Sequence, residues 1–240
     1  NTYLLYNELK ECVVIDPGCY SDDEKKELSD FIEKMGLIPK MLLNTHCHLD
    51  HVFGNSFVAE KFGLVLHIHR NEEYVLEFAP KSGLLYNLPF DNYTGKRMYL
   101  AEGDIIKLGN DELRVIEAPG HSPGHICFYC AAQHFIVSGD VLFKGSIGRT
   151  DLPGGNHQVL LKHIRENCLH FRRKRLCIAA TVLKPALGRK KNTILFLTNK
   201  LPIVSGAFCF QVQVAPCKRS LTIECNWKLV IAISQFQIKN

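Results

Sequence analysis

Three histidines and one aspartate lie within a single six-residue segment of the chain, from His46 to His51. On extended backbone the side chains of His46 and His48 point the same way, whereas Asp50 and His51 lie in the turn that follows and can surround a second point in space. The alternative interpretation is a histidine-rich surface turn, but four ligand-type residues at this spacing favour a metal site. We therefore expect this loop to provide ligands to two neighbouring metal ions.

Further candidate ligands follow segments that read as β-strands. The first loop follows the apolar run 41–43, and His121 lies in a Pro-Gly-His sequence shortly after the strand-like segment 112–116. Residues 134–137 also read as a strand, which runs into Ser-Gly-Asp and ends at Asp140. A carboxylate at this strand end is well suited to bridge two cations.

The order of these motifs resembles that of the metallo-β-lactamase fold family. The resemblance rests on His-x-His-x-Asp-His in the first loop, Pro-Gly-His ending at His121 and Gly-Asp ending at Asp140. It implies that Asp50, His51 and a bridging Asp140 hold one metal ion, and that Asp50 orients or holds a metal-bound hydroxide. The other metal ion would be held by His46, His48 and His121. Zinc suits these imidazole and carboxylate ligands, and iron or manganese could also bind.

Residues 142–155 narrow the resemblance to the compact glyoxalase II-like branch, the hydroxyacylglutathione hydrolases and their relatives. Members of this branch hydrolyse thioesters such as acylglutathiones, so the resemblance implies a small-molecule thioester substrate. The implied chemistry is attack by metal-activated water, which needs no side-chain nucleophile. Lys144 and Arg149 are candidates for contacting an anionic substrate, and the alternative is that they are solvated loop charges or structural ion pairs.

The fold class that we predict is α/β (α+β), because helical segments alternate with the strands. A capping box at residues 21–24 begins a helix that ends at Gly36, and two further helices are expected over residues 53–62 and 156–167. This pattern fits the four-layer αββα sandwich that the resemblance implies. The chain begins with Asn1 in a strand already under way, and it lacks the ending that the family resemblance implies, so we expect the sandwich to be incomplete at both ends.

Several other residues of metal-binding type are interpreted as structural. His125 begins a strand and is expected to pack beside the ligands rather than to bind metal, and Cys47 should face away from the metal. The alternating pair His67 and His69 reads as one face of a strand. Cys127 and Cys130 form C-x-x-C inside a strand, where the two side chains face opposite ways.

The composition changes past residue 166. Residues 1–166 carry 16 Lys and Arg against 23 Asp and Glu, a net charge of −7, whereas residues 167–240 carry 13 against 1, a net charge of +12. The basic runs at 171–175 and 188–191 have the composition of nucleic-acid patches, but we interpret them as fortuitous and expect no nucleic-acid partner. We expect no membrane partner either, because the apolar run 193–197 is too short to span a bilayer.

The family's catalytic core should end in a Gly-His-Gly loop whose histidine completes the second metal site, and the chain contains no such sequence. If the codons for residues 171–198 are reread from the third base of each, a Gly-His-Gly-Pro loop with a family-like continuation is permitted. We therefore predict that residues 1–166 form the hydrolase domain, lacking its first strand. Residues 167–240 would be an out-of-frame tail, disordered or poorly folded, and the second metal site would be impaired.

Three functional classes follow from the sequence. The first is a metal-dependent thioester hydrolase, and the second is a persulfide dioxygenase with one iron held by His46, His121 and Asp140. The third is an inactive frameshifted product that binds one metal ion; a nuclease is a weaker fourth class. Five cysteines in residues 1–166 without a disulfide-like framework predict a reducing, cytoplasmic location. No sequence feature specifies an oligomeric state.

Overall fold

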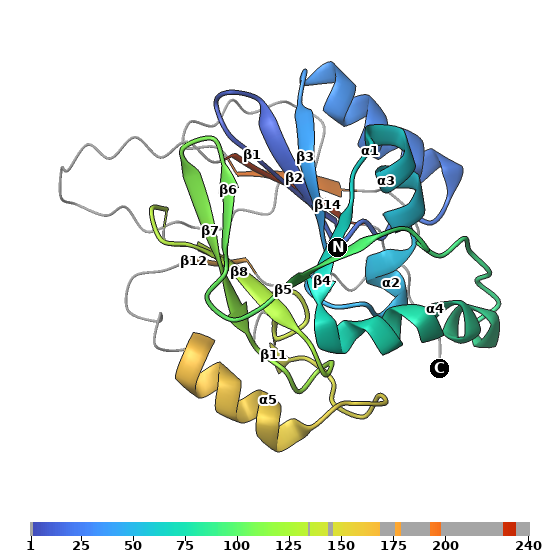
Figure 1. Cartoon of the computed structure of the whole chain (residues 1–240), viewed down its shortest axis with the longest axis vertical. Coiled ribbons are helices and arrows are strands. Elements are labelled where there is room, and N and C mark those ends of the chain that lie inside the picture. Colours follow the sequence, from blue (N-terminus) through green and yellow to red (C-terminus); the bar gives the residue numbers. More distant parts are fainter. Residues whose placement is uncertain are drawn as a thin grey trace.

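Two β-sheets lie face to face between two layers of helices in a computed structural model of the chain (Figure 1). The structure describes residues 2–133, 135–143, 146–168, 176–178, 193–197 and 228–233. Most of the predicted out-of-frame tail, together with Lys144, lies outside the described residues.

The first sheet has seven strands in the order β13-β14-β1-β2-β3-β4-β5. Strands β2 to β5 are parallel to one another, whereas β1 is antiparallel to both β2 and β14. Parallel neighbours need a crossover connection, and α1, α3 and α4 lie in these connections. The strands are β1 (Thr2–Tyr6), β2 (Glu11–Ile15), β3 (Ile38–Leu43), β4 (Leu66–His69), β5 (Arg97–Leu100), β13 (Thr193–Leu197) and β14 (Lys228–Ile233).

The second sheet has five strands in the order β12-β9-β8-β7-β6, with β12 parallel to β9 and the other neighbours antiparallel. Its strands are β6 (Ile105–Leu108), β7 (Asp111–Glu117), β8 (Ile126–Cys130), β9 (Phe135–Val137) and β12 (Leu176–Ile178). A short hairpin of β10 (Leu142–Phe143) and β11 (Ser146–Ile147) follows β9. Both sheets therefore include strands from beyond residue 166.

The helices agree with the sequence-based expectations at two of three places. The capping box is present at the start of α1, where Ser21 Oγ accepts from Glu24 N and Glu24 Oε2 accepts from Ser21 N. The expected helix 156–167 is α5 followed by one π-helical segment. The expected helix 53–62 begins two residues later, at Asn55, and the N–H of the preceding Gly54 donates to Pro17 O in the loop after β2 at 2.7 Å. The helices are α1 (Asp22–Lys34), α2 (Leu49–Val52), α3 (Asn55–Phe62), the 3-10 turn η1 (Arg70–Glu72), α4 (Glu73–Leu85), α5 (His157–His163) and the π-helical η2 (Ile164–Cys168).

Sequence analysis did not identify α4, which contains Pro80. A proline inside a helix removes the hydrogen bond to the carbonyl four residues earlier. In this helix that carbonyl belongs to Leu76, and it accepts a hydrogen bond of 2.8 Å from Asn92 Nδ2 instead. The side chain of Asn92 thus compensates for the missing backbone donor.

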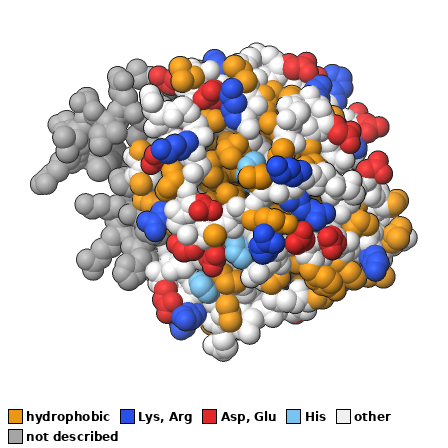
Figure 2. Space-filling view, viewed as in Figure 1, with side chains coloured by type: hydrophobic (Ala, Val, Ile, Leu, Met, Phe, Trp, Pro, Cys, Tyr) orange, Lys and Arg blue, Asp and Glu red, His pale blue; other side chains and the backbone are white. Residues whose placement is uncertain are grey.

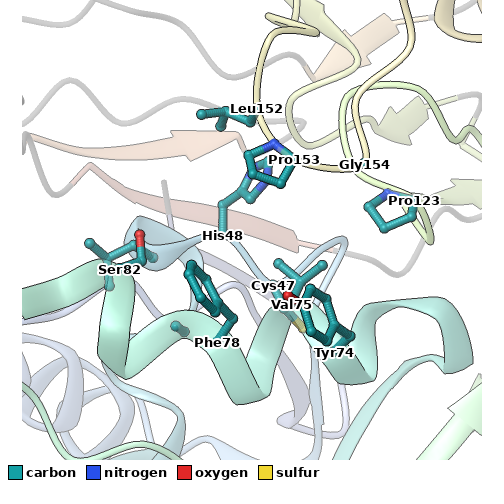
Figure 3. Close-up of a pocket in the computed structure, with 12 residues that line it drawn as sticks. Cys47, His48, Tyr74, Val75, Phe78, Ser82, Pro123, Leu152, Pro153 and Gly154 are labelled. Carbon is teal, nitrogen blue, oxygen red and sulfur yellow. The ribbon is translucent and has the colours of Figure 1, made fainter. Parts of the chain in front are cut away.

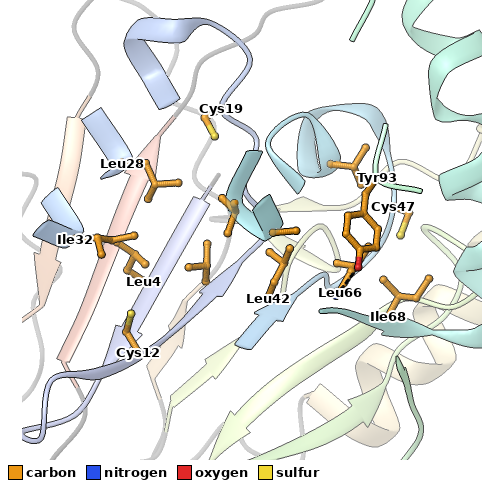
Figure 4. Packing of buried hydrophobic residues seen from close by; sticks show 14 of the residues in the cluster. Leu4, Cys12, Cys19, Leu28, Ile32, Leu42, Cys47, Leu66, Ile68 and Tyr93 are labelled. Atoms are coloured by element: carbon orange, nitrogen blue, oxygen red, sulfur yellow. Dashed lines mark hydrogen bonds between the residues drawn. The ribbon is translucent and has the colours of Figure 1, made fainter. Parts of the chain in front are cut away.

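Strict alternation along β1 separates two hydrophobic cores. Tyr3 and Leu5 point into the core between the two sheets, whereas Leu4 and Tyr6 point to the opposite face, which the helices cover. Figure 4 shows this outer core, where Leu28 and Ile32 of α1 pack on the sheet.

A third core lies on the far face of the second sheet, where α5 and η2 pack against β7, β8 and β9. The layers are therefore helix, sheet, sheet and helix, which confirms the predicted αββα sandwich. Among the described residues, no helix has the length and apolar character that a membrane span requires.

Candidate metal centre

The ligand loops meet at one edge of the sandwich because the strands before them end there. Ile15 of β2 pairs with Leu43 of β3 in parallel register, so Asp16 and the loop from residue 45 leave the first sheet side by side. In the second sheet, the loops after β7 and β9 emerge at a common edge. A hydrogen bond from Ile126 N to Thr45 O, 2.8 Å long, joins the two sheets at this point.

Nitrogen atoms of His46, His48 and His121 converge on one another. Nε2 of His121 lies 2.9 Å from Nδ1 of His48 and 3.2 Å from Nε2 of His46. Ligand atoms of all three lie within 4.8 Å of one another, and His46 and His121 are buried. Two nitrogens bound at ~2.1 Å to one tetrahedral zinc lie roughly 3.4 Å apart, so the observed cluster is close to the spacing that a shared metal ion requires.

Hydrogen bonds to the Nδ1 atoms of His121 and His46 determine that the Nε2 atoms of these two rings carry lone pairs. His121 Nδ1 donates to the Arg149 carbonyl at 2.7 Å, and His46 Nδ1 lies 3.0 Å from Thr45 Oγ1. The Thr45 hydroxyl already donates to Asp16, so it accepts from His46. Both Nε2 atoms therefore carry lone pairs that point toward each other, an unfavourable arrangement that a cation would relieve. The donor set fits a divalent metal ion.

A second group forms around His51, which is 1% exposed. Its Nε2 lies 3.4 Å from Asp140 Oδ1 and 3.6 Å from Asp50 Oδ2. The other oxygen of Asp140 lies 3.6 Å from His121 Nε2, so this carboxylate stands between the two groups. The structure thus brings together all six residues predicted as metal ligands, with Asp140 in the position expected of a bridge.

The protonation states differ between the two groups for electrostatic reasons. Burial lowers the pKa of His46 and of His121, and it lowers that of His48 to about 3. Burial also acts to lower the pKa of His51, but the carboxylates of Asp50, Asp140 and Asp16 outweigh it and raise the pKa to about 10. Without a metal ion, a proton on His51 therefore balances these carboxylates.

Asp16 is a residue of the candidate site that sequence reasoning missed. It is fully buried, and its carboxylate accepts hydrogen bonds from Thr45 N at 2.7 Å and Thr45 Oγ1 at 2.6 Å. Its Oδ2 also lies 3.1 Å from His51 Nδ1. Together with His46 and His51 it forms a second group of residues able to bind metal. The signal in the sequence was a carboxylate directly after a buried strand.

Glu72 is a second residue that the sequence did not reveal. This fully buried carboxylate accepts hydrogen bonds from Cys47 N, Ser122 Oγ and Gly124 N, at 2.6–2.7 Å. Cys47 lies between two predicted ligands, and Ser122 follows a third. Glu72 therefore connects the two loops that carry the three converging histidines.

His125 packs beside the ligands, as expected from its place at the start of a strand. Its ring stacks on that of His46 with centroids 4.7 Å apart, and its Nε2 accepts from the backbone N–H of Asp140 at 3.2 Å. A Cβ on Gly139 would lie 2.7 Å from the same Nε2. The glycine thus permits the close approach that orients Asp140.

The side chains of the other residues that the sequence singled out contact protein groups away from the six predicted ligands, where the structure describes them. Arg149 makes two contacts of 2.8 Å with Asp151, which is the ion-pair alternative to a substrate contact. Burial raises the pKa of the Cys47 thiol, so this side chain is a neutral packing group. His69 Nε2 lies 3.1 Å from Glu117, and His67 faces backbone carbonyls.

Comparison with known proteins gives a consistent picture. The model of the metallo-beta-lactamase superfamily matches residues 1–178. Hydroxyacylglutathione hydrolase GloC of Haemophilus influenzae is 33% identical over 202 residues, which cover 83% of this chain and 93% of that protein.

Two solved structures share both the fold and a substantial part of the sequence. BLEG-1 B3 metallo-beta-lactamase has a TM-score of 0.68 and 34% identity, covering 75% of this chain and 85% of that chain. TTHA1623, in a di-iron-bound form, has a TM-score of 0.66 and 31% identity, covering 77% of this chain and 87% of that chain.

Proposed function

The chain belongs to the metallo-beta-lactamase superfamily, and we propose that it is a metal-dependent hydrolase of small-molecule thioesters of the acylglutathione type. The convergence of three histidine nitrogens beside the group of His51 and Asp140 is the observation that carries the proposal. The similarity to a hydroxyacylglutathione hydrolase supports the thioester as substrate.

In this proposal His46, His48 and His121 hold one metal ion, and Asp50, His51 and Asp140 contribute to a second. A divalent metal ion bound there lowers the pKa of water and polarises a carbonyl oxygen. Asp50, with 52% of its side chain exposed, is accessible to a water molecule and can accept its proton. Thiolates leave readily, so the reaction makes small demands on a general acid.

We expect zinc as the metal, because imidazoles dominate the first group. The second site lacks the histidine that the family resemblance implies, so we expect it to bind metal more weakly. Asp16 lies at the other ring nitrogen of His51, Nδ1, so it orients this ring toward the second site and does not replace the missing histidine.

Iron-dependent persulfide dioxygenation is the second candidate. His46, His121 and Asp140, the three ligands that this activity would use, also lie together, and a similar protein binds two iron ions. The two candidates differ in what they consume, because only the dioxygenase uses molecular oxygen.

The described cysteines support a reducing location such as the cytoplasm. Three of them, Cys12, Cys19 and Cys47, are free and buried. Disulfides form and persist mainly in oxidising compartments, so free cysteines agree with a protein that is kept reduced.

Parallel assays of the purified full chain, loaded separately with zinc and iron, test the proposal. Thiol release from an S-acylglutathione is measured beside oxygen consumption with glutathione persulfide and hydrolysis of a β-lactam. We expect thiol release with zinc and no oxygen consumption. Oxygen consumption by the iron form without thiol release would replace the proposal with the dioxygenase.

A further inference from the structure

A cavity of about 190 Å³ lies directly beside the metal centre, between α4 and the loop that follows β11 (Figure 3). His48 forms part of its wall, so the cavity is continuous with the predicted ligands. The helix contributes Tyr74, Val75, Phe78 and Ser82, and the loop contributes Leu152 and Pro153. In Figure 3 the ring of His48 lies between these two walls.

The lining of this cavity is unsuited to a charged group. Among the described residues that line it there is no Lys, Arg, Asp or Glu. A charged group placed there would lose its hydration without gaining a partner, whereas an apolar group is stabilised by leaving water. The cavity therefore selects an uncharged, apolar occupant.

We propose that this cavity binds the acyl group of the substrate and makes the enzyme selective for thioesters of apolar acyl groups. The inference rests on the proposed thioester hydrolase function. An acyl group fits better than the thiol carrier, because glutathione carries two carboxylates and an ammonium group that this lining cannot pair. The carrier would lie outside the cavity, with the thioester carbonyl next to His48.

The volume sets the size of the acyl group. An apolar cavity of about 150 Å³ is large enough to bind benzene. The cavity beside His48 is somewhat larger, so it accommodates a chain or ring of roughly six carbon atoms. Hexanoyl and benzoyl thioesters are therefore expected to be better substrates than acetyl or lactoyl thioesters.

Exposed aromatic side chains at the cavity support an apolar occupant. Tyr74 is 70% exposed and Phe78 is 38% exposed, and their rings stack with centroids 6.1 Å apart. Figure 2 shows hydrophobic side chains gathered where Figure 1 places α4, and Leu84 and Leu85 extend the exposed apolar surface along the same helix. An apolar group that covers Phe78 removes part of this surface from water.

Two variants change the cavity without touching a predicted ligand. Ser82→Phe places a ring in the cavity from the helix wall, and Phe78→Ala removes part of that wall. Leu84→Phe is the matched control, because it adds an aromatic ring to the same helix at an exposed position outside the cavity. Thermal unfolding and zinc content establish that each variant is folded and loaded.

Binding of two thioethers, which cannot be hydrolysed, tests the cavity separately from catalysis. Calorimetry compares S-hexylglutathione with S-methylglutathione on the zinc-loaded protein. Each buried methylene strengthens binding about fourfold, so burial of three of the five extra methylenes predicts roughly 60-fold tighter binding of the hexyl compound. Ser82→Phe should reduce this preference to less than about fivefold, Phe78→Ala should weaken hexyl binding about fourfold, and Leu84→Phe should leave both unchanged.

Hydrolysis rates then separate this inference from the proposed function. A kcat/KM for hexanoylglutathione well above that for acetylglutathione, lost in Ser82→Phe, would support the acyl site. Equal kcat/KM values, or a hexyl preference that survives in folded Ser82→Phe, would overturn the acyl site and leave the proposed function standing. If the zinc-loaded protein hydrolyses neither thioester, the proposed function is overturned, and the assignment of the cavity to an acyl group falls with it.

Discussion

Replacing Glu72 with glutamine tests how the two ligand loops are held together. Oε1 of Glu72 accepts from Ser122 Oγ and Gly124 N, whereas Oε2 accepts from Cys47 N. Glutamine has the same shape but only one oxygen, and its NH₂ group can only donate. If the oxygen stays with Ser122 and Gly124, the NH₂ group faces the N–H of Cys47, and two donors oppose each other.

The expected loss of stability follows from these three hydrogen bonds. An unpaired buried N–H costs about 1–3 kcal/mol, and the two remaining bonds weaken by roughly 1 kcal/mol each because their acceptor is now neutral. Burial raises the pKa of Glu72, so removing its charge returns part of this loss. We expect the free energy of unfolding to fall by about 2–3 kcal/mol, which corresponds to a melting temperature lower by roughly 4–12 °C.

Urea unfolding and zinc titration measure the two consequences of Glu72→Gln. Because the displaced backbone lies between His46 and His48, we also expect zinc affinity to fall about tenfold, the lower end of the range for such supporting residues. Glu60→Gln is the control, since Glu60 is exposed on α3 and should change neither quantity. A Glu72→Gln protein as stable as the parent, with unchanged zinc affinity, would refute the role assigned to this carboxylate.

Three further predictions concern the metal centre. Removing metal with a chelator should lower the melting temperature, because a ligand at 1,000 times its Kd contributes about 4 kcal/mol; an unchanged midpoint would argue against a bound metal. Gly148→Ala places a Cβ 1.8 Å from the carbonyl oxygen of Asp140, so it should lower the free energy of unfolding by about 1–3 kcal/mol and weaken metal binding. In the control Gly36→Ala the added Cβ meets no atom within 4 Å, and metal binding should stay intact. Metal-free protein should be most stable near pH 6.5, as followed by urea unfolding. The stability that neutral His48 contributes is lost as the pH falls from 6.5 toward about 3. The stability that protonated His51 contributes is lost as the pH rises from 6.5 toward about 10. A flat stability profile from pH 5 to 9 would contradict these assignments.

The parts of the site that the sequence predicted are those carried by short local motifs. The loop from His46 to His51 is recognisable because its spacing alone determines which side chains can meet. Asp16 and Glu72 were missed because their partners are distant in sequence. Thr45 is 29 residues from Asp16, and Gly124 is 52 residues from Glu72. Such pairs depend on the register of the strands and not on a motif.

The fold was predictable to the same degree. Alternating strands and helices indicated the four layers, and the capping box placed the start of α1 correctly. The helix α4 was not recognised, because a proline normally indicates the end of a helix, whereas α4 continues through Pro80. The cavity beside His48, which α4 lines, escaped prediction with it. The expected helix from residue 53 also began too early. A Cβ on Gly54 would lie 2.8 Å from Pro17 O, which shows how closely the chain passes the loop after β2 at this point.

Thiol release from an S-acylglutathione, measured while zinc is added stepwise to metal-free protein, tests the central claim most directly. The account predicts no release without metal, a rate that rises with added zinc until the histidine site is filled, and loss of this response in His121→Gln. Thiol release that does not depend on metal, or none from folded protein that has bound zinc, would contradict it.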